Sequence, residues 1–269
     1  MLVDAHVHVF DPGRVPFAAG VHYVPTGPEI GTAEQLRRTH DEHGVRHALL
    51  VGPNSGYGED NRYLLDVLAS APERYRGMAV VPVDAGAAEL ARLRAAGVVG
   101  ITLNAALLGV DHYQDAAPQL AALAGLDMIA DVQVVDDQLV ALTPLLERAG
   151  VRVVVDHCGR PDPAAGLADP GFQELLRWGR AGRAVVKLSG LVKFSHEPHP
   201  HEDTWPFVAA LLDVFGPDRC VWASDWPFLR APARIDYGPL LALAEELVPD
   251  AADRRRVLWD TPRREFFGS

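Results

Sequence analysis

The chain has 269 residues, with 25 Lys and Arg against 36 Asp and Glu, so its formal net charge is −11. A hydrophobic content of 48% and a charged content of 23% are typical of a globular protein and exclude a disordered chain. The acidic balance argues against a general binder of nucleic acid or of anionic membranes, whereas a locally basic pocket for a small anionic substrate is compatible with it.

Short runs rich in β-branched residues recur along the whole chain and predict strands. These runs are Val3–Val9, His47–Val51, Met78–Val83, Val99–Asn104, Met128–Val132, Val151–Asp156, Ala184–Leu188 and Cys220–Ser224. Amphipathic segments between them predict helices. These segments are Ala33–His43, Asn61–Ala69, Ala87–Ala96, Gln119–Leu123, Gln138–Ala149, Phe172–Gly182, Phe207–Phe215 and Pro239–Leu247.

Eight strands alternating with eight helices in this length predict a single (β/α)8 barrel over residues 1–269. A doubly wound open sheet is the alternative, but no Gly-x-Gly-x-x-Gly follows the first strand. Three loops rich in Pro and Gly, at Asp11–Gly31, Asp162–Gly171 and Glu197–Pro206, are expected to leave strand ends. A barrel builds its active site from such loops.

The two cysteines, Cys158 and Cys220, form no Cys-x-x-Cys pair, which argues against a disulfide-stapled secreted domain. The first residues lack the pattern of a signal peptide, and no run approaches the roughly 18 apolar residues of a membrane span. We therefore expect a cytoplasmic protein without a membrane partner. Whether it forms a homo-oligomer stays open.

The strongest chemical signal is Asp4-Ala5-His6-Val7-His8 in the first predicted strand. Alternation along a strand places Asp4, His6 and His8 on one face, which would point into the barrel. Two imidazoles two residues apart can converge on one metal ion or one substrate oxygen, and Asp4 would then orient His6. The alternative is a pair of structural histidines held by loop hydrogen bonds.

The sixth predicted strand ends in Asp156-His157-Cys158-Gly159-Arg160-Pro161. His157 therefore lies where a barrel places catalytic side chains, although a loop-capping histidine is the structural alternative. We expect Cys158 to pack in the loop rather than to act as a nucleophile, because no feature of the sequence activates it.

The eighth predicted strand ends in Ser224-Asp225-Trp226-Pro227. An inward-pointing Asp225 would lie beside His6 and His8, where a carboxylate can bind a metal ion or accept a proton from water. The structural alternative is an aspartate that caps the next helix.

Lys187 ends the seventh predicted strand in Lys187-Leu188-Ser189-Gly190. If it faces inward it needs a carboxylate partner, and Asp4 or Asp131 can supply one. A structural role and a catalytic role are both open for it.

The loop that follows the seventh predicted strand contains His196, His199 and His201. Prolines interrupt this loop, so we expect solvated active-site histidines rather than a metal site.

Taken together, these motifs resemble the amidohydrolase superfamily and, within it, the TIM-barrel lactonases that act on pyrone dicarboxylates, sugar lactones and muconolactones. The resemblance covers nearly the whole chain, in order and at suitable spacing. His-x-His alone is shared with many hydrolases and decarboxylases. Its combination with Asp156–Pro161 and Ser224–Pro227 is much more specific.

The resemblance implies a role for each matching residue. Asp225 would activate the attacking water. The histidines would polarise the lactone carbonyl directly or hold a metal ion that does so; they are His6, His8 and His157. Tyr23 and Ser55, in the loops after the first and second strands, match positions that can contact a small-molecule substrate. We also expect Asn104 and Lys193 to contact it.

The sequence also departs from the pattern of two-metal members of the superfamily. The fourth strand ends in Asn104 instead of carrying a Lys or Glu ligand, and the fifth offers Asp131 and Gln133 instead of a His. Two readings of the cofactor therefore stay open. One divalent ion, zinc or manganese, would be held by His6, His8 and Asp225; otherwise catalysis is metal-free.

A further departure concerns the substrate. Dicarboxylate-binding members carry arginines after the fourth strand, and this chain has none there, which argues against pyrone dicarboxylate itself. Lys193 and Arg160 can still bind one carboxylate or sulfonate.

These features predict a hydrolase that opens a small lactone with water activated by Asp225. One alternative is a metal-dependent, non-oxidative decarboxylase of an aromatic or muconate-type acid, which would need a third histidine ligand on the fifth strand. Another is a non-catalytic barrel that only binds its ligand.

Overall fold

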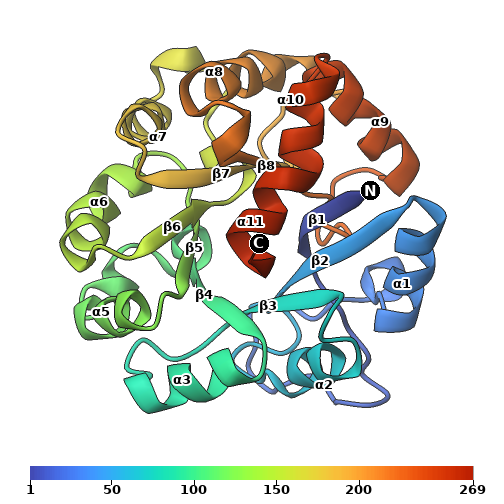
Figure 1. Cartoon of the computed structure of the whole chain (residues 1–269), viewed down its shortest axis with the longest axis vertical. Coiled ribbons are helices and arrows are strands. Elements are labelled where there is room, and N and C mark those ends of the chain that lie inside the picture. Colours follow the sequence, from blue (N-terminus) through green and yellow to red (C-terminus); the bar gives the residue numbers. More distant parts are fainter. Residues whose placement is uncertain (269) are drawn as a thin grey trace.

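The strands form one closed barrel. The computed structural model describes residues 1–268. Its strands follow one another in a single eight-stranded parallel sheet. They are β1 (Leu2–Val7), β2 (Val45–Val51), β3 (Tyr75–Ala79), β4 (Val98–Asn104), β5 (Ile129–Gln133), β6 (Arg152–Val155), β7 (Ala184–Leu188) and β8 (Cys220–Trp222). The chain after β8 returns to β1, where Asp225 N donates to His6 O at 2.9 Å. The predicted (β/α)8 barrel is confirmed (Figure 1).

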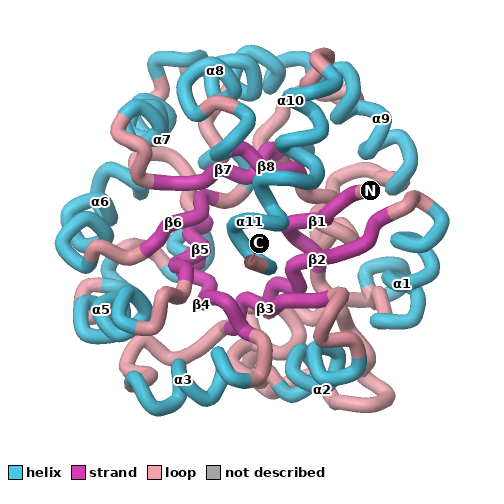
Figure 2. The backbone as a smooth tube through the Cα atoms, in the orientation of Figure 1, coloured by secondary structure: helices cyan, strands magenta, loops and turns pink. Residues whose placement is uncertain are grey.

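Helices surround the sheet (Figure 2). They are α1 (Ala33–Glu42), α2 (Arg62–Ser70), α3 (Ala87–Ala95), α4 (Ala105–Leu108), α5 (Ala117–Gly125), α6 (Gln138–Ala149), α7 (Pro170–Arg180), α8 (Trp205–Phe215), α9 (Tyr237–Leu247), α10 (Ala251–Arg255) and α11 (Thr261–Phe267). Single 3₁₀ turns span Gly27–Glu29, Asp111–Tyr113, His157–Gly159, Gly166–Ala168, Leu191–Lys193, Glu202–Thr204 and Pro217–Arg219, and a π-helical turn spans Arg256–Asp260.

All the predicted strands and helices form, with ends shifted by a few residues. The start of α1 follows from its sequence, because Thr32 and Gln35 make a capping box that satisfies two backbone amides. The largest shift is in β3, which ends at Ala79 instead of Val83. The Asn61 side chain binds both the N–H and the C=O of Val80, which takes that residue out of the strand ladder.

The barrel interior is apolar at its lower end. One buried cluster gathers side chains from different strands around the barrel: Ala5, Leu49, Val51, Met78, Ile129, Val154, Val185, Val221 and Ala223. The alternate residues of the same strands pack outward against the helices. This double burial explains why the strands are nearly continuous apolar runs rather than alternating ones.

The first strand contains an irregularity that changes which side chains point inward. Its register against β2 shifts between Asp4 and Val7. Ala5 belongs to the interior cluster, whereas Asp4 faces the helices and accepts a 2.8 Å hydrogen bond from the Tyr237 hydroxyl of α9. His6 keeps its inward direction. The prediction that Asp4 shares its face and orients its ring is therefore wrong, because the bulge interrupts the period of two.

The C-terminal helices cover the amino ends of the strands, and the sequence pattern did not predict them. Phe266 of α11 inserts into the interior cluster. Arg152 at the start of β6 donates to the Glu265 carboxylate at 3.0 Å. Figure 1 shows α11 lying over the centre of the barrel. With this end closed, the carboxyl ends of the strands form the mouth of the barrel.

No helix in residues 1–268 combines the length and the apolar character that crossing a membrane requires.

Candidate active site

A cavity of about 480 Å³ opens at the carboxyl ends of the strands, where barrel enzymes bind small molecules. Several residues expected at the site line it: His6, His8, Ser55, Asn104, Lys193 and Asp225. His157 is fully buried next to them. Tyr23 is not among the lining residues; its hydroxyl donates to the Glu29 carboxylate, and its ring lies 5.5 Å from the guanidinium carbon of Arg230.

Three imidazoles converge on one carboxylate oxygen. Oδ1 of Asp225 lies 3.5 Å from Nε2 of His8, 3.7 Å from Nε2 of His6 and 3.9 Å from Nε2 of His157. The Nε2 atoms of His6 and His8 are 3.3 Å apart. The fold thus brings together polar groups from the ends of β1, β6 and β8, which are far apart in the sequence.

Each of two imidazoles is held through its other nitrogen. His8 Nδ1 donates to the carbonyl oxygen of Val51 at 2.8 Å, which fixes the ring with Nε2 facing Asp225. His157 Nδ1 lies 3.0 Å from the Ser189 hydroxyl. Gly190 makes room for this ring, because a Cβ there would lie 2.5 Å from Nδ1 of His157.

The backbone of Asp225 is held in a conformation that few side chains adopt. Its φ is +61°, in the left-handed region, which aspartate tolerates better than most residues. The Asp4 carboxylate accepts a hydrogen bond from Ser224 N at 2.9 Å, and the Ser224 hydroxyl accepts one from Trp226 N at 3.0 Å. Lys193 Nζ lies 2.8 Å from Oδ2 of Asp225. These contacts aim Oδ1 at the histidines.

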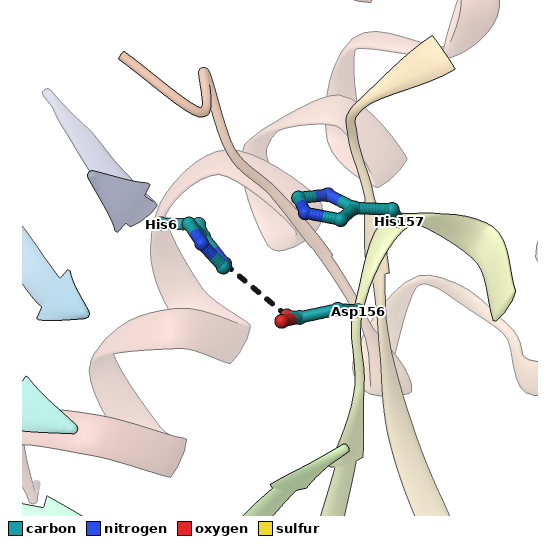
Figure 3. Close-up of side chains that lie close together, drawn as sticks. All are labelled: His6, Asp156 and His157. Carbon is teal, nitrogen blue, oxygen red and sulfur yellow. Dashed lines mark hydrogen bonds and ion pairs between the residues drawn. The ribbon is translucent and has the colours of Figure 1, made fainter. Parts of the chain in front are cut away.

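A buried cluster of charged side chains contacts the His6 ring on the side away from Asp225. Lys187 Nζ is fully buried, 2.9 Å from Asp131 and 2.8 Å from Asp156. Asp156 Oδ1 also lies 3.2 Å from Nδ1 of His6, and Figure 3 shows this contact with His157 beside it. Of the two carboxylates expected to pair with Lys187, Asp131 does so and Asp4 does not. Asp156 is a second partner, which was not expected.

Burial and neighbouring charges set the protonation states. Burial lowers the pKa of His157 to about 3 and also lowers the pKa of His6, so both rings are neutral at neutral pH. Burial by itself raises the pKa of Asp225, but the Lys193 ammonium and the facing histidines lower it well below its usual range. The site therefore contains an ionised carboxylate beside the neutral imidazoles of His6 and His157.

The donor atoms fit a single divalent metal ion. Two groups of ligand atoms lie within 4.8 Å of one another: His6, His8 and Asp225, and His6, Asp156 and His157. In tetrahedral coordination with metal–ligand distances of about 2.05 Å, ligand atoms are about 3.3 Å apart. The His6–His8 separation of 3.3 Å matches this value, and their 3.7 and 3.5 Å separations from Asp225 are close to it. The first group can hold such an ion.

Two other sequence features lie outside this chemistry. Cys158 is fully buried, and burial raises the pKa of its thiol to about 12. In the histidine-rich loop, His201 Nδ1 lies 2.9 Å from the Glu197 carbonyl, and His196 Nε2 lies 3.7 Å from Asp162. Within residues 1–268, the histidines of this loop join no group of potential metal ligands.

Several cavity residues were not singled out from the sequence. Asn54, Thr102 and Arg230 all line the cavity. Asn54 could have been found because it follows β2 in a Pro-Asn-Ser turn at the same edge as Ser55. Arg230 has no local signal, since it lies in an irregular loop after β8 whose path depends on the Glu29 carboxylate that accepts from its backbone N–H.

Comparisons with known proteins agree with this site. The family model described as Amidohydrolase matches residues 3–268. A 2-pyrone-4,6-dicarboxylate hydrolase from Comamonas testosteroni is 30% identical over 281 residues, covering 98% of this chain and 90% of the relative. A 4-sulfomuconolactone hydrolase from Rhizobium radiobacter is 29% identical over 273 residues, covering 98% of this chain and 89% of the relative.

A solved structure is similar over the same length. The crystal structure of a putative 2-pyrone-4,6-dicarboxylic acid hydrolase from Pseudomonas putida matches with a TM-score of 0.88 and 30% identity, covering 98% of this chain and 97% of the other. The chain belongs to the amidohydrolase family.

Proposed function

We propose that this protein hydrolyses a small lactone to the corresponding hydroxy acid. The observation that carries the proposal is the convergence of three imidazole Nε2 atoms on Oδ1 of Asp225, 3.5 to 3.9 Å away. The relatives named above, which are hydrolases of cyclic esters, support it. A cavity of about 480 Å³ suits a single ring with one or two substituents.

Asp225 is the base in the proposed reaction. Its ionised carboxylate takes a proton from water as the water oxygen attacks the lactone carbonyl carbon. The carbonyl π bond opens to give a tetrahedral oxyanion. When the oxyanion collapses, the ring C–O bond breaks, and the carboxyl group of Asp225 returns its proton to the leaving alkoxide. The products are one carboxyl group and one hydroxyl group, so water is consumed and the enzyme is regenerated.

The histidines stabilise the negative charge that develops on the carbonyl oxygen. Preorganised groups of this kind contribute most when water is excluded, and the side chains of His6 and His157 are almost fully buried. One divalent ion, zinc or manganese, held by His6, His8 and Asp225, would supply Lewis-acid polarisation of the same oxygen. In metal-free catalysis, an Nε2–H group of the cluster would donate to the oxyanion instead.

The decarboxylase alternative has no observation in its favour. It needs a third histidine ligand from β5, and that strand instead directs Asp131 to Lys187. Gln133, the other polar residue of β5, lines the cavity and offers an amide. Lactone hydrolysis needs no such ligand.

The direct test measures acid release from a panel of sugar, muconate and pyrone lactones. We expect Asp225→Asn and His157→Ala each to lower kcat by about 100-fold or more. Matched controls are Asp115→Asn and His112→Ala, at exposed positions away from the cavity. Wild-type rates in both site variants would refute the assignment.

A second measurement separates the two ways of stabilising the oxyanion. The purified protein is analysed for metal content and then assayed after chelation and after adding back zinc or manganese. A stoichiometric metal whose removal abolishes activity favours the metal ligand set. Full activity in metal-free protein favours the imidazole donors.

A further inference from the structure

Arg160 is a cation without a partner in the wall of the cavity. It follows the turn that carries His157, and its side chain lines the cavity. Its Nε atom is buried and has no hydrogen-bond partner. Within residues 1–268, no carboxylate oxygen lies within 4.0 Å of its guanidinium nitrogens, although Asp225 and Asp136 act on it from a greater distance. Shielding a guanidinium from water without a counter-ion is costly, so such a group points to a ligand that supplies the negative charge.

The two lysines of the site are already paired with carboxylates. Lys193 is 2.8 Å from Asp225, and Asp156 is 2.8 Å from Lys187 behind the wall. Arg230, the other cation of the lining, is exposed at the mouth and lies beside the Glu29 carboxylate, which accepts a 2.7 Å hydrogen bond from its backbone N–H. Arg160 is thus a positive charge of the cavity wall that has no ion-pair partner and that is less exposed than Arg230. Burial lowers its pKa, and the nearby carboxylates of Asp225 and Asp136 offset this only in part.

The wall formed by the ends of β2 and β4 is polar but uncharged. Asn104 donates from Nδ2 to Asn54 Oδ1 at 3.0 Å, which fixes both amides at the edge of the cavity. The Thr102 hydroxyl also lines this wall, and it is buried without a hydrogen-bond partner. Amides and hydroxyls can donate to and accept from uncharged oxygen substituents, and they offer an anion no opposite charge. The cavity is therefore cationic at Arg160 and neutral at Thr102 and Asn104.

We propose that the substrate is a lactone bearing a single anionic group, a carboxylate or a sulfonate, which forms a bidentate pair with Arg160. Its uncharged oxygen substituents contact Thr102 and Asn104. This proposal rests on the proposed lactone hydrolysis and adds the charge and the orientation of the substrate. A planar guanidinium matches either anion through two parallel hydrogen bonds, so both belong to the same class.

The test compares pairs of lactones that differ by one charge. 5-Oxotetrahydrofuran-2-carboxylate and 6-oxotetrahydropyran-2-carboxylate are each assayed beside their primary amides, which have nearly the same shape. We expect wild-type kcat/KM to be about 100-fold higher for the carboxylates, mainly through KM. Arg160→Gln should remove most of this preference, and Arg160→Lys should restore part of it. Arg38→Gln, which removes an exposed arginine of α1, is the matched control.

The outcomes separate this proposal from the one on which it rests. Equal rates for carboxylate and amide, or an equal loss on both in Arg160→Gln, would overturn the anion site while lactone hydrolysis stands. If the wild-type protein hydrolyses no lactone of the set, lactone hydrolysis loses its support. Binding of 5-oxotetrahydrofuran-2-carboxylate, measured as a rise in the Tm of the protein, then tests the anion site. A rise that Arg160→Gln abolishes supports it, and no rise in the wild type overturns it.

Discussion

Replacing Lys187 by Met should destabilise the protein by about 3–4 kcal/mol at pH 7 while leaving the barrel folded. The ammonium is fully buried between Asp131 and Asp156, and methionine keeps most of the apolar stem. At 2.8 Å and an effective dielectric constant of about 20, the Lys187–Asp156 attraction is about 6 kcal/mol. The loss of stability is smaller than this attraction, because the Asp156 carboxylate of the variant can bind a proton instead of staying charged. Protonating a carboxyl group with a reference pKa of about 3.9 costs about 4 kcal/mol at pH 7.

Equilibrium unfolding in guanidinium chloride, followed by circular dichroism at pH 7, measures this loss. The double variant Lys187→Met, Asp156→Asn provides the critical comparison, because it removes the uncompensated carboxylate together with the ammonium. We expect it to recover at least about 1 kcal/mol relative to Lys187→Met. A single-variant loss below about 1 kcal/mol, or a double variant less stable than the single one, would refute the electrostatic account of this cluster.

Three further predictions concern titration and chemical access. Burial raises the pKa of Asp131 to about 8, so folding takes up a proton between about pH 4 and pH 8, and this contribution to stability falls as the pH rises. Unfolding measured at pH 5 and pH 8 should therefore show Asp131→Asn gaining stability relative to the wild type at the higher pH; a constant difference would contradict this. Because Cys158 and Cys220 are buried and burial raises both pKa values, Ellman's reagent at pH 8 should label neither thiol in the native protein and both in denaturant; fast native labelling would contradict this. Acetylation of the native protein should modify Lys193 but not Lys187, as peptide mass spectrometry can show, and it should abolish hydrolysis; full activity after complete Lys193 modification would exclude its role beside Asp225.

The barrel could be predicted because its signal is repeated along the chain. Buried strands, amphipathic helices and glycine ends recur at regular spacing, so an error at one end of an element leaves the topology intact. The C-terminal helices α10 and α11 are not part of this repeated pattern. Pro262 interrupts their pattern in the sequence, yet in the fold it directly follows the π-helical turn Arg256–Asp260, in the first turn of α11.

Only part of the site could be predicted. Whether a residue ends a strand follows from the residues around it, whereas a contact across the barrel does not. His6, His8, His157 and Asp225 stand out as polar residues that end apolar strands. That Asp156, rather than Asp4, contacts the His6 ring depends on the β1 bulge and on the radius of the closed barrel. Neither property is encoded within a few residues of either side chain.

The use of lysine links the fold to the chemistry. The chain contains two lysines among its 25 basic residues, and both hold carboxylates of the site. Lysine is a compact point charge on a flexible stem, which fits between carboxylates in the narrow interior of a barrel, whereas the planar fork of arginine requires more room. Arginine is kept for the surface and for Arg160, where two parallel donors can face a ligand across open space. The shapes of the two side chains therefore explain their different positions. Lysine neutralises carboxylates within the barrel wall, and Arg160 presents its charge to the substrate.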